Sequence, residues 1–166
     1  MQTALIAAIL VAGKESIALI FGVEVVTLTI IVCAFVFPPR VSITAAVVFC
    51  TLEWLIYGFG YWVVAYYLYW PPLALVASLL RLVKKTLPRN ILAVVIAVTV
   101  TAFFGVLTSV VDAAFASFGE WRLFFVYFPI IYIRGVWFYA PYIVSNGVIV
   151  GVLFTPLTGV LVKNVK

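Results

Sequence analysis

The sequence predicts an all-α integral membrane protein: a bundle of six transmembrane helices with the N- and C-termini in the cytoplasm. Of its 166 residues, 67% are hydrophobic and only 9% are charged, whereas soluble domains carry about 25% charged residues. The apolar runs are long and unbroken rather than alternating, which favours helices over a β-barrel. Six helices of about 20 residues would use about 120 residues, so residues 1–166 are expected to form a single transmembrane domain.

Proline and glycine set the expected helix boundaries. The predicted helices cover residues 2–21, 24–37, 41–57, 61–82, 91–118 and 136–162. Pro38-Pro39 ends the second helix, because proline disfavours a helical conformation at the preceding residue. Gly58-Phe59-Gly60 separates the third helix from the fourth, and Pro71-Pro72 is expected to kink the fourth. The first run has no basic stretch before it, so we expect a retained helix rather than a cleavable signal.

Residues 119–135 are expected to form a loop between the last two helices. The loop has an apolar segment of its own, residues 123–133, framed by Arg122 and Arg134. This segment either re-enters the membrane or lies along its surface, and the sequence leaves both alternatives open.

The basic residues predict the orientation of the bundle. With the N-terminus inside, seven of the ten fall on the cytoplasmic side: Arg40, Arg81, Lys84, Lys85, Arg89, Lys163 and Lys166. Lys14, Arg122 and Arg134 fall outside. Because Lys and Arg favour the cytoplasmic side, the distribution supports both termini inside. The net charge of +5 is then an orientation signal, and nothing else in the sequence indicates nucleic-acid binding.

The acidic residues gather on the opposite side. In this topology all five fall toward the outer face: Glu15, Glu24, Glu53, Asp112 and Glu120. The aromatic residues around the glycine turn share that face: Trp54, Tyr57, Tyr61 and Trp62. So do Trp121, Arg122 and Arg134. We interpret this convergence as an outward cavity for a flat, polar, ring-containing small molecule, with aromatic stacking and carboxylates that accept N–H donors. An arginine there would take a carboxylate or phosphate.

Structural explanations compete with this interpretation. Ionisable groups inside a membrane usually line a pathway or pair with one another, so Glu53 and Asp112 fit a binding role or a structural ion pair. Single Trp and Tyr residues collect at membrane interfaces in any case.

Enzyme chemistry and metal binding find no support in the sequence. There is no His, which removes the commonest general base and metal ligand. The two cysteines, Cys33 and Cys50, fall inside apolar runs and are expected to be buried small hydrophobes. No thiol or carboxylate spacing suits zinc or iron. We therefore expect no enzyme activity, no metal and no cofactor.

The first helix carries small residues at every fourth position: Ala4, Ala8 and Ala12. Such a stripe allows the backbone of another helix to approach closely. The approaching helix belongs either to the same bundle or to a partner subunit.

Taken together in order, several segments resemble one family, the substrate-binding S components of energy-coupling factor (ECF) transporters. The resemblance covers nearly the whole chain and rests on four segments: Ala4-Leu5-Ile6-Ala7-Ala8 continuing to Ala12, Val23 to Leu28, Glu53 to Trp62, and Asn146 to Leu157. The segment from Glu53 to Trp62 is similar to an uncharacterised branch of that family. Relatives near this branch often carry Asp and His shortly before the last-helix Asn, whereas residues 140–145 contain neither.

The resemblance implies a function. S components bind a vitamin or another water-soluble micronutrient from outside, between the outer loops and the last three helices. They hydrolyse no ATP; a membrane coupling subunit and two ATPases do so, and the absence of a GxxxxGK[ST] loop agrees with this. The alanine stripe would dock on the coupling subunit, and the loaded S component would topple in the membrane to release ligand inside.

These expectations define a candidate site in the plasma membrane of a bacterial cell. The candidate ligand-binding residues are Glu24, Glu53, Trp54, Tyr57, Tyr61, Trp62, Asp112, Trp121, Arg122, Arg134 and Asn146; the candidate docking residues are Ala4, Ala8 and Ala12. Two other function classes stay open. A stand-alone small-molecule transporter would work in cells that lack the ECF module, and a structural membrane subunit would bind no small molecule.

Overall fold

A computed structural model describes residues 1–165 and consists of helices joined by short connections. The elements are α1 (Gln2–Ser16), α2 (Val26–Val36), α3 (Pro39–Tyr57), α4 (Tyr61–Ser78), the short 3₁₀ helix η1 (Leu79–Leu82), α5 (Thr86–Ala116) and α6 (Trp121–Val165). The described part of the chain contains no β-strand, which confirms the all-α prediction. Lys166, one of the basic residues assigned to the cytoplasm, lies outside the described residues.

Four segments are long and apolar enough to cross a membrane. They are Pro39–Tyr57, Tyr61–Leu82, Thr86–Ala116 and Trp121–Asn164, and Val26–Val36 is a shorter apolar helix. The chain is therefore a helical membrane protein with several candidate spans. Helices α1 and α2 have 15 and 11 residues, fewer than the roughly 20 that a full span needs. Six spans and a cytoplasmic position of the termini stay predictions.

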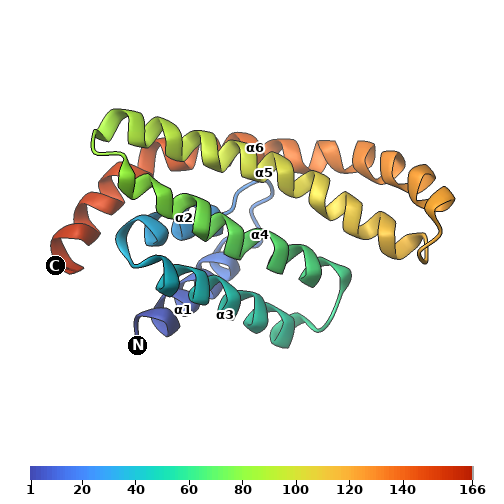
Figure 1. Ribbon diagram of the computed structural model, residues 1–166, viewed down its shortest axis with the longest axis horizontal. Coiled ribbons are helices and arrows are strands. Elements are labelled where there is room, and N and C mark those ends of the chain that lie inside the picture. Colours follow the sequence, from blue (N-terminus) through green and yellow to red (C-terminus); the bar gives the residue numbers. More distant parts are fainter. Residues whose placement is uncertain (166) are drawn as a thin grey trace.

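Helix α2 lies at the centre of the bundle and contacts all five other α-helices. Eight of its 11 residues are buried, as a helix that is apolar on all sides requires. Helices α5 and α6 run side by side along the long axis, and both chain termini lie toward one end of the molecule (Figure 1). Cys33 and Cys50 are buried free thiols, as expected.

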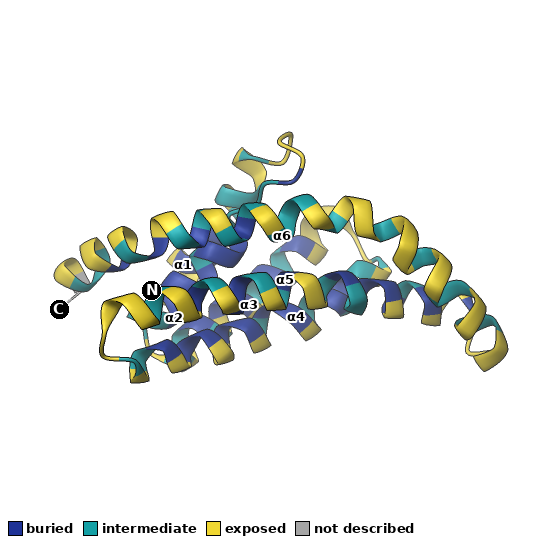
Figure 2. Cartoon of the chain, turned by 90° about the horizontal axis from the view of Figure 1, so that it is seen from above, coloured by how far each residue is buried: buried dark blue, intermediate teal, exposed yellow. Residues whose placement is uncertain are grey.

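Figure 2 shows that the outward-facing sides of the helices are exposed, and many of the exposed residues are large and hydrophobic. Large hydrophobic side chains such as Leu68, Leu75, Val95 and Phe103 are more than half exposed. A soluble monomer rarely leaves contiguous apolar surface of this kind uncovered, whereas lipid tails are as apolar as these side chains. The exposed faces therefore suit a surrounding bilayer.

The predicted loop at residues 119–135 is wrong, because α6 is a continuous helix from Trp121. The chain reverses within a few residues after α5, where Phe118 and Gly119 have φ values of 51° and 83°. Pro129, Pro141 and Pro156 lie inside α6 without ending it. Proline is tolerated in membrane helices, because neighbouring groups can satisfy the freed carbonyls. Helix α4 likewise continues through Pro71-Pro72 to Ser78.

The first predicted helix is too long. Helix α1 ends at Ser16 instead of residue 21, and residues 17–25 form a non-helical connection to α2. Gly22 in this connection has φ +78°, and an added Cβ would lie 2.7 Å from Pro141 of α6. The connection therefore needs glycine both for its backbone conformation and for its close contact with α6.

The glycine turn between α3 and α4 is present as predicted. Gly58 has φ 79° and ψ 174°, a combination that is essentially restricted to glycine. A Cβ on Gly60 would lie 2.6 Å from the Trp62 ring nitrogen. This turn fixes where α4 begins, and α4 supplies one wall of the cavity described next.

Candidate functional site

A cavity of about 300 Å³ lies among the α1–α2 connection, α4, α5 and α6. Its lining residues come from these elements and from the ends of α1 and α2: Lys14, Ile17, Ala18, Ile20, Val23, Glu24, Val26, Tyr66, Tyr69, Trp70, Thr101, Phe104, Phe138, Tyr139, Tyr142 and Asn146. A volume of this size is at the lower end of the range for small-molecule sites.

The carboxylate of Glu24 is held at the start of α2. Its Oε2 accepts hydrogen bonds from the backbone N–H groups of Val26 at 3.0 Å and Thr27 at 3.2 Å. These groups belong to the first turn of α2, where backbone donors have no partner within the helix and the helix dipole favours a negative charge. Glu24 lies in the α1–α2 connection, where burial raises the pKa of its carboxyl group and hydrogen bonds to Thr27 and Asn146 oppose that rise.

Asn146 of α6 joins three elements at the cavity. Its Nδ2 donates to Glu24 Oε1 at 2.8 Å and to Thr101 Oγ1 of α5 at 2.9 Å. The residue is fully buried, and its Oδ1 has no partner among the described residues. A buried carbonyl oxygen without a partner is uncommon in native proteins and calls for a ligand or a water molecule. The arrangement therefore offers an acceptor beside a carboxylate.

Aromatic rings form most of the remaining wall. Tyr66, Tyr69 and Trp70 of α4 pack against Phe104 of α5, with centroid distances of 6.1, 4.5 and 6.2 Å. The Nε1 of Trp70 is buried and has no partner among the described residues. Polar and aromatic groups together in one cavity suit a flat ring that carries hydrogen-bond donors and acceptors.

Lys14 connects the cavity to a buried ion pair. Lys14 lines the cavity, and its ammonium group pairs with the fully buried carboxylate of Glu53 on α3. It also lies 4.6 Å from the centroid of the Tyr57 ring and 3.9 Å from Glu15. The Tyr57 hydroxyl donates to Glu15 at 2.6 Å. This cluster fastens the end of α1 to the end of α3.

Two of the eleven predicted ligand-binding residues line the cavity, Glu24 and Asn146. Three more contact lining residues: Glu53 pairs with Lys14, the exposed ring of Tyr57 lies 4.6 Å from the Lys14 ammonium group, and Trp62 packs edge-on against Tyr66 at 5.0 Å. The structure brings these five residues to one region.

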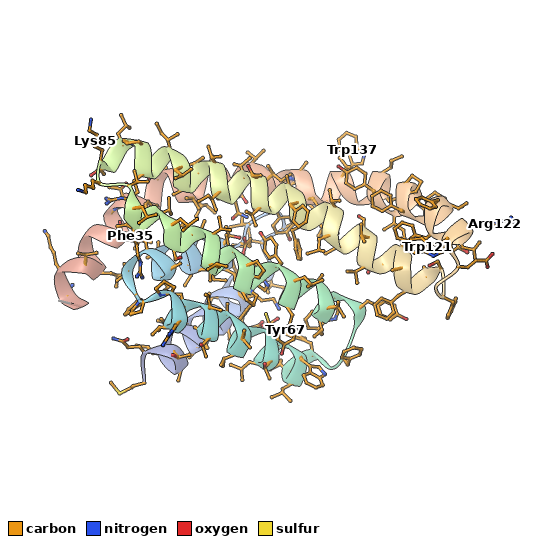
Figure 3. The ribbon with its side chains drawn as sticks, in the orientation of Figure 1. Phe35, Tyr67, Lys85, Trp121, Arg122 and Trp137 are labelled. Atoms are coloured by element: carbon orange, nitrogen blue, oxygen red, sulfur yellow. The ribbon has the colours of Figure 1, made fainter. Side chains whose placement is uncertain are left out.

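The other six predicted residues do not line the cavity. Trp54 and Tyr61 are exposed around the glycine turn, and Tyr61 stacks on Phe115 at 4.3 Å. Asp112 is half-buried on α5. Trp121, Arg122 and Arg134 are exposed on the part of α6 nearest its start, and Figure 3 shows Trp121 and Arg122 at the far tip of the α5–α6 pair. We expected all polar groups on the outer side to meet in one cavity, and this was wrong for most of them. The reason is that α5 and α6 extend well past the α3–α4 turn.

Sequence reasoning missed several lining residues. Lys14 was assigned to the outer side of the membrane but not to the ligand-binding residues, although a lysine and a glutamate inside apolar helices are an obvious pair to test. The α4 residues Tyr66, Tyr69 and Trp70 lie at i, i+3 and i+4 and so share one helix face. That spacing identifies them as a group, but the sequence does not indicate which helix they face.

Comparisons with known proteins give no relative: no family model, curated protein or solved structure matches this chain. Within residues 1–165, no group of three His, Cys, Asp or Glu side chains is arranged to hold a metal ion.

Proposed function

We propose that this protein is the substrate-binding subunit of an ECF-type importer. In this proposal it captures a vitamin-like, ring-containing micronutrient in the cavity and delivers it inward with a coupling subunit and ATPases in a bacterial cell membrane. The observation that carries the proposal is the pairing of Glu24 with Asn146 in an aromatic cavity. Both residues line the cavity, and the amide oxygen of Asn146 has no partner among the described residues.

The polarity of the cavity favours ligand binding over a purely structural role. A structural bundle gains nothing from leaving a buried amide oxygen and a buried indole N–H without partners, because each such group costs free energy. A ligand with N–H donors and a ring acceptor would satisfy both. The aromatic walls would stack on the same ring.

The first helix supports the docking part of the proposal. Ala4, Ala8 and Ala12 are all exposed, while Ile6, Ala7 and Leu10 on the same helix are buried. The small-residue stripe is thus not used for packing within the chain. A coupling subunit that places a helix along this stripe would bury it closely.

Native mass spectrometry of protein purified from cells grown in rich medium tests ligand capture. We expect a bound non-lipid small molecule on the wild type and its loss from Asn146→Leu. Ser145→Ala is the matched control, because Ser145 bonds only to the carbonyl of Tyr142 on its own helix. A chain that binds lipid alone in every sample would contradict the proposed function.

Co-purification with an ECF coupling subunit tests docking. Ala8→Trp should abolish the complex and leave the cavity ligand bound, because the substitution blocks only the exposed face of α1. Ala102→Trp on the exposed face of α5 is the control and should assemble normally. Normal assembly of Ala8→Trp would remove the stripe from the interface. Uptake in cells without the ECF module would instead favour a stand-alone transporter.

A further inference from the structure

A second cavity lies where α2 and α6 end and α5 begins, and it is not used by the proposed function. It has a volume of about 320 Å³ and is lined by Phe35, Val36, Arg81, Val83, Lys84, Arg89 and Val162. These residues come from the end of α2, from η1 and the connection after it, and from the start of α5 and the end of α6, which lie at the same end of that helix pair. Phe35 and Lys85 mark this end in Figure 3, opposite Trp121 and Arg122.

The two arginines of this basic pocket have side-chain nitrogens without partners. Arg81 Nε donates to the carbonyl oxygen of Ala34 at 3.0 Å, which fixes the guanidinium group, while its Nη2 is buried and unpartnered among the described residues. Arg89 Nε is also buried and unpartnered, and its guanidinium group lies 4.6 Å from the centroid of the Phe35 ring. Both arginines are half-buried as residues, but a charged donor atom shielded from water and left unpaired is costly. Their positions therefore indicate an acceptor that is not supplied by the chain.

No acidic side chain neutralises the pocket. Three cationic residues line it, and none of the five acidic residues in the sequence does. Helix α5 begins between Lys84 and Arg89, at Thr86, and has no side-chain cap, so the positive end of its dipole adds to the same field. Guanidinium groups match the oxygens of a phosphate in a bidentate fork. The expected ligand is therefore an anion with several oxygen acceptors.

The rest of the lining is apolar. Phe35, Val36, Val83 and Val162 line the same cavity as the cations, and exposed Leu79 and Leu82 continue the apolar surface on η1. A phosphate group that carries hydrocarbon chains would occupy both the cationic and the apolar parts of the cavity. The ends of membrane helices are where lipid phosphates lie, and basic pockets between such helices bind anionic headgroups.

We propose that the basic pocket binds a phosphate group, supplied by the headgroup of an anionic membrane phospholipid. The site is separate from the vitamin-like ligand cavity and does not depend on the proposed function. Arg81 and Arg89 hold the phosphate oxygens, Lys84 adds charge, and the acyl chains follow the apolar surface of η1.

The test uses the full chain in nanodiscs that contain equal amounts of phosphatidylglycerol and phosphatidylcholine with the same acyl chains. After transfer to detergent, native mass spectrometry measures which lipid stays bound. The wild type should retain phosphatidylglycerol in preference to phosphatidylcholine. Arg89→Gln and Lys84→Gln should each weaken that retention about tenfold, through loss of a charge-assisted contact. Arg40→Gln, an exposed arginine outside the pocket lining, is the charge-matched control and should behave like the wild type.

Three outcomes decide between the explanations. Equal retention of the two lipids by the wild type, or an equal loss in Arg40→Gln and Arg89→Gln, would overturn the phosphate site. A thermal stabilisation of lipid-free protein by inorganic phosphate that disappears in Arg89→Gln would assign the site to a free phosphate. Stabilisation by phosphatidylglycerol alone would assign it to the lipid. Arg81→Gln is a further variant for the case in which one substitution prevents folding.

Discussion

The two cavities have nearly the same volume, about 300 and 320 Å³, and each has two lining residues with a buried polar atom that lacks a partner among the described residues, but their polar side chains are tied to the rest of the chain in different ways. In the first cavity Glu24, Asn146 and Thr101 bond to one another across three elements, and Lys14 is paired with Glu53. In the basic pocket Arg81 donates only to a backbone carbonyl, and Arg89 only packs on the Phe35 ring. What differs is therefore not the cavity size but whether the polar lining residues hydrogen-bond to side chains of other elements.

This difference predicts that substitutions around the first cavity cost folding stability and that substitutions in the basic pocket do not. Lys14→Met should have the largest effect, because it leaves the buried carboxylate of Glu53 without a counter-charge. Breaking a buried ion pair costs about 3–5 kcal/mol, and since Lys14 is partly exposed we expect about 3 kcal/mol. Equilibrium unfolding in mixed micelles measures this change.

The double variant Lys14→Met/Glu53→Leu separates the charge from the packing. It should recover much of the lost stability, since replacing both members of a buried pair by apolar residues is often nearly neutral. Lys163→Met, an exposed lysine near the end of α6, should change stability by less than about 0.5 kcal/mol. A Lys14 variant that is as stable as the Lys163 variant would show that the ion pair does not hold α1 to α3.

Asn146→Ala should have the second largest effect, about 2 kcal/mol, because it removes a buried donor from both Glu24 and Thr101. The same unfolding measurement applies, and Ser145→Ala is again the control. An unchanged stability would mean that Glu24 is held by the first turn of α2 alone.

Thr101→Val should cost about 1 kcal/mol, since one acceptor of Asn146 is lost while the side-chain shape is kept. Combining it with Asn146→Ala should add little further cost, because the two residues share one hydrogen bond. Fully additive effects in this double-mutant cycle would show that the two side chains act independently and would break the description of a connected cluster.

Arg89→Gln should have the smallest effect, less than about 1 kcal/mol in micelles without anionic lipid, since only its contact with the Phe35 ring is lost. A difference from the wild type should emerge when phosphatidylglycerol is added, because only the wild type would then gain stability from binding. A large loss of stability without lipid would mean that Arg89 already has partners within the chain, and the contrast between the two cavities would fail.

Part of the ligand cavity could be predicted from the sequence alone. Glu24 and Asn146 were both predicted as ligand-binding residues, and they meet at 2.8 Å across the bundle although 122 positions separate them in the chain. Ionisable residues in an apolar chain are rare enough to be noticed one by one, which identified Glu24, whereas Asn146 was identified through the resemblance of its segment to a known family. Arg122, Arg134 and Asp112 satisfied the same criterion but do not line the cavity. Knowing on which side of the membrane a residue lies only weakly constrains which residues it contacts, because helices of different lengths extend to different heights.

Composition and local residue patterns determined the class of the protein. The 67% hydrophobic content excludes a water-facing globule, and the demand for internal backbone hydrogen bonds in lipid then selects helices. The turn at Gly58-Phe59-Gly60 could also be predicted from the local sequence, since Gly58 adopts a backbone conformation that other residues rarely reach.

Only the tertiary structure decided how the helices face one another. Because every helix is apolar around much of its surface, hydrophobic periodicity carries little information about which face is buried, and the sequence could not place Tyr66, Tyr69 and Trp70 against Phe104 of α5. It could not reveal that α6 continues through three prolines, since packed neighbours decide whether a proline breaks a membrane helix. The sequence also could not show that Lys14 pairs with Glu53 or that Arg81 and Arg89 line one pocket, because both depend on how elements far apart in the chain pack together.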